Sequence, residues 1–344
     1  MRRIAIVLFC AFLLGLVWAR SATAPERHDG IVRLVSLDLH AMPAPGKNMQ
    51  LLAAWQLASD DADFGGYSAL AMLGNGRFLA LSDRGRQLRF DDPSAGPMRA
   101  VMARFAASER QDKFDTDAEA MTRDSVSGTL WAAYEYGNAI LRVAADGTSR
   151  KVSPRAMADW PENSGPEAMV RLADGRFIVL SESQGGAFGG GGEGLLFPGD
   201  PVAGAKPLQF GFQAPDGYRP TDMAALPDGR VMILLRKVVF PVPPRFSSAL
   251  LLADPATIGA NRLWQGKIVA RFDSPLPTEN YEGLAISADS DDAGAVIVWM
   301  ISDDNTAVLQ RTLLLKLRWK VPARDFSRRH DADTKKGAPP RGTP

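Results

Sequence analysis

Acidic side chains recur at corresponding places along this 344-residue chain, close to the ends of short apolar segments. Glu119 and Glu167 each precede an Ala-Met pair that opens such a segment, and Glu182 follows one. The acidic residues that share this placement are Asp83, Glu119, Glu135, Glu167, Glu182, Glu282 and Asp303. Clustered carboxylates repel one another and suit a hard cation such as Ca²⁺, which takes about six to eight oxygen ligands. We therefore expect a metal site if the fold gathers them; the alternatives are a solvated acidic funnel with internal salt bridges, and carboxyl pairs that share a proton.

Basic side chains occupy the same kind of position. They are Arg84, Arg219, Arg236 and Lys237. Guanidinium and ammonium groups bind phosphate and carboxylate groups, and they also offset the charge of neighbouring carboxylates. The sequence thus predicts a place for a small anionic ester beside the cation.

The elements that position these residues form a repeat. Five similar stretches begin near residues 68, 119, 167, 221 and 282. A repeat of about 50 residues built from short apolar runs is typical of the blades of a β-propeller. The predicted fold is all-β, with five four-stranded antiparallel blades, or six if residues 31–57 contribute more than a closing strand. The last repeat is short of one strand, so we expect an N-terminal strand to close the ring.

Tight turns separate the apolar runs of three repeats, at Asn75-Gly76, Asp174-Gly175 and Asp228-Gly229. Such pairs supply the positive φ angles of hairpin turns. Folding each hairpin about its turn predicts which residues face each other at its other end, which in a propeller is one rim of the central channel. The expected facing pairs are Ser68 with Asp83, Glu167 with Glu182 and Thr221 with Arg236, and longer turns bring Glu119 near Glu135 and Glu282 near Asp303.

Histidine and cysteine are missing from the repeats. The three histidines are His28, His40 and His330. The only cysteine is Cys10. These positions argue against a Ser-His-Asp triad, a three-histidine zinc site and a thiol nucleophile in the repeats. Hydrolysis would then use carboxylates, a metal-bound water or both, and Ser68, Ser82 and Ser181 are expected to make structural hydrogen bonds.

The ends of the chain differ from the repeats. Residues 1–24 show two arginines, an apolar run and a small-residue stretch in the order of a secretory signal. The alternative is an uncleaved N-terminal anchor, which would be the expected link to a membrane. Residues 321–344 are charged and rich in Pro and Gly, which predicts a disordered tail. We expect a periplasmic or secreted protein, and the balance of 40 basic and 39 acidic residues argues against nucleic acid as its partner.

Several sequence elements together point to a known family. They are Phe64-Gly-Gly-Tyr-Ser-Ala-Leu, Leu81-Ser-Asp-Arg-Gly85, Glu119-Ala-Met121, Gly165-Pro-Glu-Ala-Met169 and Glu279-Asn-Tyr-Glu-Gly-Leu284. The chain resembles, over about residues 31–320, the phytase-like propeller family, whose members are described as having esterase-like activity of phytase. The resemblance implies an exported bacterial propeller acting on phosphate or carboxylic esters, and it carries no catalytic residue across. Thr221 and Arg236 depart from the acidic pattern, which argues against a symmetric calcium cluster.

Two functions remain open on these grounds. In the first, the protein is an ester hydrolase in which a cation at the rim polarises the ester or activates water, while Arg84 and Arg236 bind the anionic group. In the second, a non-catalytic propeller binds a ligand or a cell-envelope partner through the same rim. Clustered carboxylates with interspersed arginines favour the first function, whereas the lack of histidine and thiol in the repeats favours the second.

Overall fold

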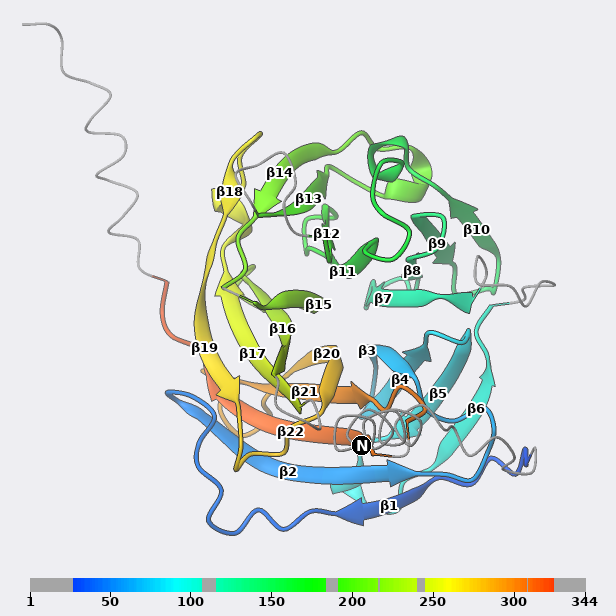
Figure 1. Ribbon diagram of the computed structural model, residues 1–344, viewed down its shortest axis with the longest axis vertical. Helices are drawn as coiled ribbons and strands as arrows, with labels where there is room; N and C mark the ends of the chain where they lie inside the picture. Colours follow the sequence, from blue (N-terminus) through cyan, green and yellow to red (C-terminus); the bar gives the residue numbers. More distant parts are fainter. Residues whose placement is uncertain are drawn as a thin grey trace, which may run out of the picture.

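The computed structural model describes residues 27–106, 116–183, 191–215, 217–239, 245–307 and 309–324. In this part of the chain five sheets stand around a central axis like the blades of a propeller, with antiparallel pairing except for one short outer pair (Figure 1). The predicted fold is confirmed, with five blades and not six. The expected signal segment 1–24 lies outside the described residues, as does 325–344 of the expected tail.

Each blade starts at the axis with its innermost strand. Blade one consists of β3 (Tyr67–Gly74), β4 (Arg77–Ser82), β5 (Arg86–Asp91) and β6 (Ala100–Arg104). Blade two consists of β7 (Ala118–Arg123), β8 (Leu130–Tyr134), β9 (Ala139–Val143) and β10 (Ser149–Val152). Blade three consists of β11 (Pro166–Arg171), β12 (Phe177–Ser181), β13 (Gly192–Phe197), β14 (Leu208–Phe212) and the parallel β18 (Leu263–Trp264). Blade four consists of β15 (Arg219–Ala225), β16 (Val231–Val239), β17 (Arg245–Ala253) and β19 (Gly266–Phe272). Blade five consists of β20 (Asn280–Ala288), β21 (Ala295–Asp303), β22 (Thr312–Lys320), β2 (Met49–Ala58) and β1 (Arg33–Ser36).

Short 3-10 helices lie between the strands. They are η1 (Pro93–Ala95), η2 (Arg155–Met157), η3 (Pro201–Ala203) and η4 (Pro255–Thr257). Among the described residues, the structure has no helix with the length and hydrophobicity that a membrane span requires.

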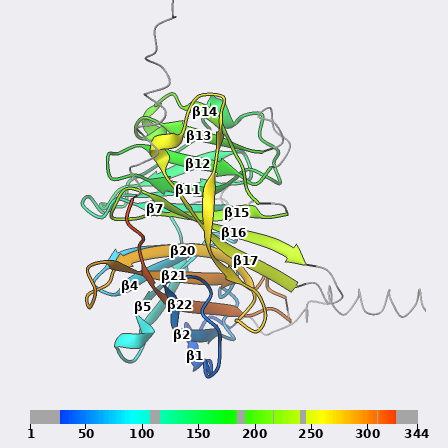
Figure 2. The same ribbon diagram turned by 90° about the vertical axis from the view of Figure 1, so that its left-hand side faces the viewer.

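The N-terminal strand β2 closes the ring. It pairs antiparallel with β22, from Met49 opposite Trp319 to Leu57 opposite Thr312. The side view shows β20, β21, β22, β2 and β1 following one another in this blade (Figure 2). The expected closing strand is confirmed, and the pairing satisfies backbone groups of β22 that an open array would leave unpaired.

Apolar side chains fill the spaces between neighbouring blades. All nine residues of β21 are buried, because both faces of the sheet pack against neighbours. Trp299 of blade five packs on Phe78 of blade one with ring centroids 4.7 Å apart. Trp131 of blade two packs on Phe177 of blade three at 5.0 Å. Aromatic contacts of this kind fix the angle between blades and thereby the geometry of the channel.

Every innermost strand carries a β-bulge near its start. The inserted residues are Ser68, Glu119, Glu167, Thr221 and Glu282. A bulge places two residues opposite one and re-aims a side chain. The repeat therefore delivers one such side chain per blade at the same level of the ring.

The bulges change the register that symmetric hairpins would have. The expected pairs that are shifted out of register are Ser68 with Asp83, Glu167 with Glu182 and Thr221 with Arg236. Arg236, for example, lies opposite Arg219. The prediction of these exact pairs was wrong because two shifts add up in each hairpin. One lies at or next to the turn, where for example Ala225 pairs with Val231 and not with Met232, and the other is the bulge near the start of the strand.

Candidate functional site

The mouth of the channel gathers carboxylates from several blades. The negative charges of Glu119, Glu182 and Glu282 all act on Glu167. The negative charges of Glu282 and Asp83 in turn act on Glu119. The predicted convergence is thus present, and we call these residues, with Asp117, Glu135 and Asp303, the acidic mouth.

Burial and mutual repulsion shift the ionisation of the acidic mouth. Burial raises the pKa of Glu119 well above its ordinary value, and the charge of Glu282 raises it further. Burial also raises the pKa of Glu167 well above the usual range, with Glu119 as the strongest charged neighbour. The other members whose pKa is raised, with burial as the first cause, are Asp83, Glu135, Glu282 and Asp303. Loss of water and neighbouring like charge both disfavour the ionised form.

Asp117, Glu119 and Glu135 form the tightest group of the acidic mouth. One carboxylate oxygen from each lies within 4.8 Å of the others. Glu119 belongs to β7, Asp117 directly precedes this strand, and Glu135 follows β8. The backbone N–H of Glu135 donates to the Asp117 carbonyl at 2.9 Å, which holds the two segments together. Sequence reasoning missed Asp117, which directly precedes the strand and lies outside the repeating acidic positions.

Arg236 neutralises part of the mouth. Its guanidinium contacts Glu182 at 3.0 Å and Glu282 at 2.6 Å, and it donates to the Asn280 side-chain oxygen at 2.9 Å. Asn280 also donates to Glu282 at 2.9 Å and to Asp303 at 3.3 Å. The departure of blade four from the acidic pattern therefore supplies a counter-ion for blades three and five. Asn280 was not singled out from the sequence, where it reads as an ordinary strand-start residue.

Arg84 is engaged by the backbone. It donates to the carbonyls of Ala62 at 3.2 Å and Gly65 at 3.1 Å, and also to that of Phe64. Its ion pair with Asp83 is long, at 4.0 Å. These bonds fasten the loop before β3, so the guanidinium has few donors left for a substrate.

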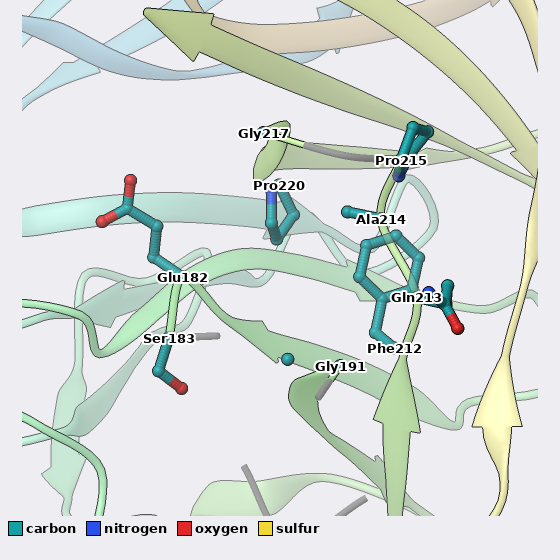
Figure 3. Close-up of a pocket in the computed structure, with 10 residues that line it drawn as sticks. Glu182, Ser183, Gly191, Phe212, Gln213, Ala214, Pro215, Gly217 and Pro220 are labelled. Carbon is teal, nitrogen blue, oxygen red and sulfur yellow. The ribbon is translucent and has the colours of Figure 1, made fainter. Parts of the chain in front are cut away.

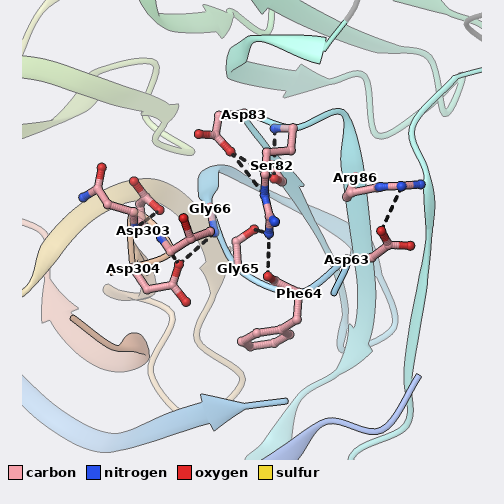
Figure 4. A network of polar contacts seen from close by, with 12 residues as sticks. Asp63, Phe64, Gly65, Gly66, Ser82, Asp83, Arg86, Asp303 and Asp304 are labelled. Atoms are coloured by element: carbon pink, nitrogen blue, oxygen red, sulfur yellow. Dashed lines mark hydrogen bonds and ion pairs between the residues drawn. The ribbon is translucent and has the colours of Figure 1, made fainter. Parts of the chain in front are cut away.

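Two glycines let that loop pass between carboxylates (Figure 4). Gly66, at φ +70°, lies so close to Asp83 that a Cβ would come 2.4 Å from its Oδ1 atom. Gly65, at φ +94°, would meet Asp304 at 2.7 Å, and the Gly66 N–H donates to Asp304 at 3.1 Å. The Phe-Gly-Gly and Ser-Asp-Arg-Gly elements are thus two halves of one packed turn at the mouth.

The serine residues divide into two kinds. Ser82 accepts the Arg84 N–H at 3.1 Å, and Ser181 donates to the Ser164 carbonyl at 2.6 Å. The expected structural hydrogen bonds of these two are confirmed. The same expectation was wrong for Ser68, the bulged residue of blade one. It is 2% exposed, and its hydroxyl has no hydrogen-bond partner among the described residues.

Asp222 is a completely buried carboxylate that sequence reasoning missed. It accepts backbone N–H groups of Met223 at 2.8 Å and Leu284 at 2.7 Å, with Leu70 as a third donor. Burial raises its pKa well above the ordinary value, and the three N–H groups act in the opposite direction. Gly283 allows this approach, since a Cβ there would lie 2.9 Å from the backbone of β3. Asp222 therefore ties blades four, five and one together.

His28 lies beside Asp61 and Asp63, with its Nδ1 atom 3.8 and 3.6 Å from their carboxylates. Arg86 already pairs with Asp63 at 2.8 Å, and the Gly30 N–H donates to Asp61 at 2.8 Å. This group links the segment before β1 to the loop before β3.

A small pocket lies beside Glu182 (Figure 3), and the remaining predicted cations contact two of the residues around it. Arg219, 46% exposed at its side chain, lies 3.4 Å from Glu182, and Lys237 lies over the Tyr218 ring at 5.6 Å. The pocket has a volume of about 140 Å³. It is lined by Glu182, Ser183, Gly191, Gly192, Phe212, Gln213, Ala214, Pro215, Gly217 and Pro220.

Solved structures similar to this one share little sequence identity with it. A selenomethionine-substituted virginiamycin B lyase from Staphylococcus aureus is 13% identical, with a TM-score of 0.37, and the match covers 72% of this chain and 64% of the lyase chain. A hypothetical protein from Leishmania major is 12% identical, with a TM-score of 0.41 and coverage of 75% and 87%. No curated protein matches the chain. Similarities at this level say nothing about substrate or chemistry.

A family model gives a more direct assignment. The model described as "Phytase-like: Esterase-like activity of phytase" matches residues 62–306. That span runs from the loop before β3 to the loop after β21 and contains the acidic mouth and the pocket. The chain belongs to the phytase-like family.

Proposed function

We propose that this protein is an exported ester hydrolase that uses a divalent cation, Ca²⁺ in the first place, at its acidic mouth. The observation that carries the proposal is the group formed by Asp117, Glu119 and Glu135, whose oxygens lie within 4.8 Å of one another. Three carboxylates offer up to six oxygens, which matches the coordination number of about six to eight that Ca²⁺ takes.

Charge compensation supports a cation at this place. Arg236 forms ion pairs with Glu182 and Glu282 on the side of blades three to five. Burial and neighbouring negative charge raise the pKa of Glu119 and Glu167, which means that their ionised forms are poorly compensated. The buried hydroxyl of Ser68 has no hydrogen-bond partner in the described part of the chain and lies on the bulge next to that of Glu119 around the ring. It is a further polar group suited to an oxygen-coordinated ion or its water.

The chemistry would be hydrolysis with a carboxylate as the base. A Ca²⁺ ion at the mouth would polarise the ester and lower the pKa of a bound water. A carboxyl group with a raised pKa takes a proton from the attacking water and returns one to the leaving oxygen. The water oxygen becomes bonded to phosphorus or carbonyl carbon, the ester C–O or P–O bond breaks, and the products are an acid and an alcohol.

The test is a calcium titration of purified protein against phosphate and short-chain carboxylic esters. We expect turnover that rises with Ca²⁺ and falls at least 100-fold in Asp117→Asn/Glu135→Gln. Asp146→Asn, on an exposed turn of blade two, is the control and should keep wild-type activity. Hydrolysis that is unaffected by EDTA and by the double substitution would refute the metal-assisted mechanism.

A non-catalytic ligand-binding propeller is the second candidate. It is favoured by the engagement of Arg84 with backbone carbonyls and of Arg236 with carboxylates, which leaves these two arginines poorly placed to stabilise a transition state. Calcium binding without turnover of any ester in the same titration would decide for this second candidate.

A further inference from the structure

A second pocket lies between blades one and five, at the end of their innermost strands that is opposite to the acidic mouth. It is bordered by the turn after β3 and by the end of β20, and we call it the far pocket. Ala288, which lines it, lies six residues after Glu282 on β20, or about 20 Å away along an extended strand. All of its lining residues belong to the described part of the chain. The far pocket is therefore a separate place from the acidic mouth.

The wall of the far pocket in blade one contains a second β-bulge. Between β3 and β4, the shift next to the turn is a bulge within the ladder, between Met72 and Gly74. The other four innermost strand pairs show a single bulge within their ladders, near the mouth. Met72, Leu73 and Gly74 line the far pocket. Because a bulge bends its strand and re-aims side chains, this extra bulge shapes the pocket in a way that the other blades do not repeat.

Apolar side chains form the floor of the far pocket. Phe78 and Trp299, whose rings pack across the two blades at 4.7 Å, both line it, together with Met72 and Ile297. The far pocket has a volume of about 590 Å³. This is about four times the volume of an engineered cavity of about 150 Å³ that binds one benzene molecule. An aliphatic chain of about ten carbons therefore fits on this floor.

Three charged residues line the far pocket, and two of them compensate each other. Lys316 pairs with Asp92 at 3.2 Å and lies over the Trp299 ring at 4.9 Å. The third is Arg123, at the end of β7, whose guanidinium makes no ion pair or hydrogen bond with another described residue. The edge of the far pocket thus carries one uncompensated positive charge above an apolar floor.

We propose that the far pocket binds an amphipathic carboxylate, a single carboxylate group on a medium-length aliphatic chain. Arg123 donates a pair of parallel hydrogen bonds to the carboxylate. The lining residues Ser125 and Ser287 offer further hydroxyl donors. The chain lies on the apolar floor and leaves water. A cationic amphiphile meets the same floor but the wrong charge. The binding site is independent of the proposed hydrolysis at the mouth.

The experiment compares ligands that differ in chain length or in charge. Decanoate, hexanoate and decyltrimethylammonium are titrated into the purified protein by calorimetry, with EDTA present. We expect decanoate to bind at least tenfold more tightly than hexanoate, because four more methylene groups leave water. Decyltrimethylammonium should bind at least tenfold more weakly than decanoate, because it cannot pair with Arg123.

Two substitutions separate the charge from the chain. Arg123→Gln should weaken decanoate about tenfold, since it removes a charge-assisted hydrogen bond, and should not weaken decyltrimethylammonium. Ala288→Trp fills the far pocket from an exposed lining position and should weaken decanoate at least tenfold. The controls are Arg89→Gln and Ala203→Trp, which change exposed residues outside the far pocket and should leave both affinities unchanged.

Three results would overturn the proposal. They are no binding of decanoate, equal binding of decanoate and decyltrimethylammonium, and an affinity for decanoate that neither Arg123→Gln nor Ala288→Trp lowers. None of them bears on the acidic mouth, because the titrations contain EDTA and no ester. A protein without ester turnover that binds decanoate as expected would lose the proposed hydrolysis and keep the far pocket as a ligand site.

Discussion

Two sides of the same channel mouth differ in how their buried carboxylates are compensated. On the side of blade two, Asp117, Glu119 and Glu135 crowd together, and burial raises the pKa of the two glutamates. On the side of blades three and four, Arg236 reaches across to Glu182 and Glu282. The innermost hairpin of one blade ends in an arginine. This single difference divides the mouth into a side where carboxylates crowd together and a side where an arginine balances them. The repeats thus determine the fold, and the one blade that departs from the acidic pattern determines how charge is distributed at the mouth.

Removing the arginine should erase the difference between the two sides. In Arg236→Gln the carboxylate of Glu282 loses its counter-ion inside the mouth, and that of Glu182 keeps only the exposed Arg219. We expect a loss of about 3–5 kcal/mol in the free energy of unfolding, which is typical when one partner of a buried ion pair is removed. Urea denaturation in EDTA measures it, with Arg33→Gln at an exposed pair as control. A loss below about 1 kcal/mol would show that the pair is effectively exposed.

Supplying a cation should act on the acidic side alone. Calcium at about 100 times its dissociation constant should stabilise the protein by about 2.7 kcal/mol. Glu119→Gln/Glu135→Gln should abolish this gain, and it should raise the stability of the metal-free protein because repulsion is relieved. The melting temperature with and without Ca²⁺ is the measurement. Equal stabilisation of the double variant and the wild type would place any calcium elsewhere.

Raising the pH should weaken the acidic mouth as a whole in the absence of metal. Burial raises the pKa of Glu119, Glu167 and Asp303 in the folded protein, so the folded state binds more protons than the unfolded state. Their contribution is fully present below the unfolded pKa, about 4 for these side chains, and is lost as the pH rises through the folded values. Each unit of raised pKa corresponds to about 1.4 kcal/mol.

The melting temperature in EDTA should therefore fall as the pH is raised from 4.5 to 8. Glu119→Gln/Glu167→Gln should flatten the curve. A melting temperature that rises with pH across this range, and does so equally in the double variant, would contradict the assigned burial of these carboxylates.

Changing the exposed cation should have the smallest effect on stability. Arg219 is 46% exposed at its side chain and 3.4 Å from Glu182, and exposed pairs contribute about 0–1 kcal/mol. We expect Arg219→Gln to change the free energy of unfolding by less than about 0.5 kcal/mol. A larger loss in urea denaturation would mean that Arg219, and not Arg236 alone, maintains the compensated side.

The positions of the acidic residues were partly predictable from the sequence repeat. Glu119, Glu167 and Glu282 recur with the repeat, so any closed ring of these hairpins gathers them at one mouth. Their exact partners were not predictable, because the geometry of each turn and the bulge near the start of each innermost strand both set the register, and neither is evident from the residue types. Asp117 was missed because it lies before the strand and joins the group only through the loop geometry of blade two.

The contacts of the basic residues were not predictable from the sequence repeat. Arg84 and Arg236 occupy related positions in their repeats, yet one fastens a loop through backbone carbonyls and the other bridges two carboxylates. Which of these contacts a guanidinium makes depends on the neighbours within reach of its long side chain. For Arg84 they lie in the loop before β3, and for Arg236 they lie on blades three and five.

The amino-acid sequence by itself determined a propeller of five repeats, the closing strand and the gathering of carboxylates, because apolar periodicity and turn chemistry act within each repeat. Whether the ring has five blades or six was decided only by the closed structure. The tertiary structure alone decided which charges are compensated, that Asp222 is buried against three backbone N–H groups, and that a pocket lies beside Glu182. These depend on distances of a few ångströms between residues far apart in the chain. Only the closed ring sets such distances.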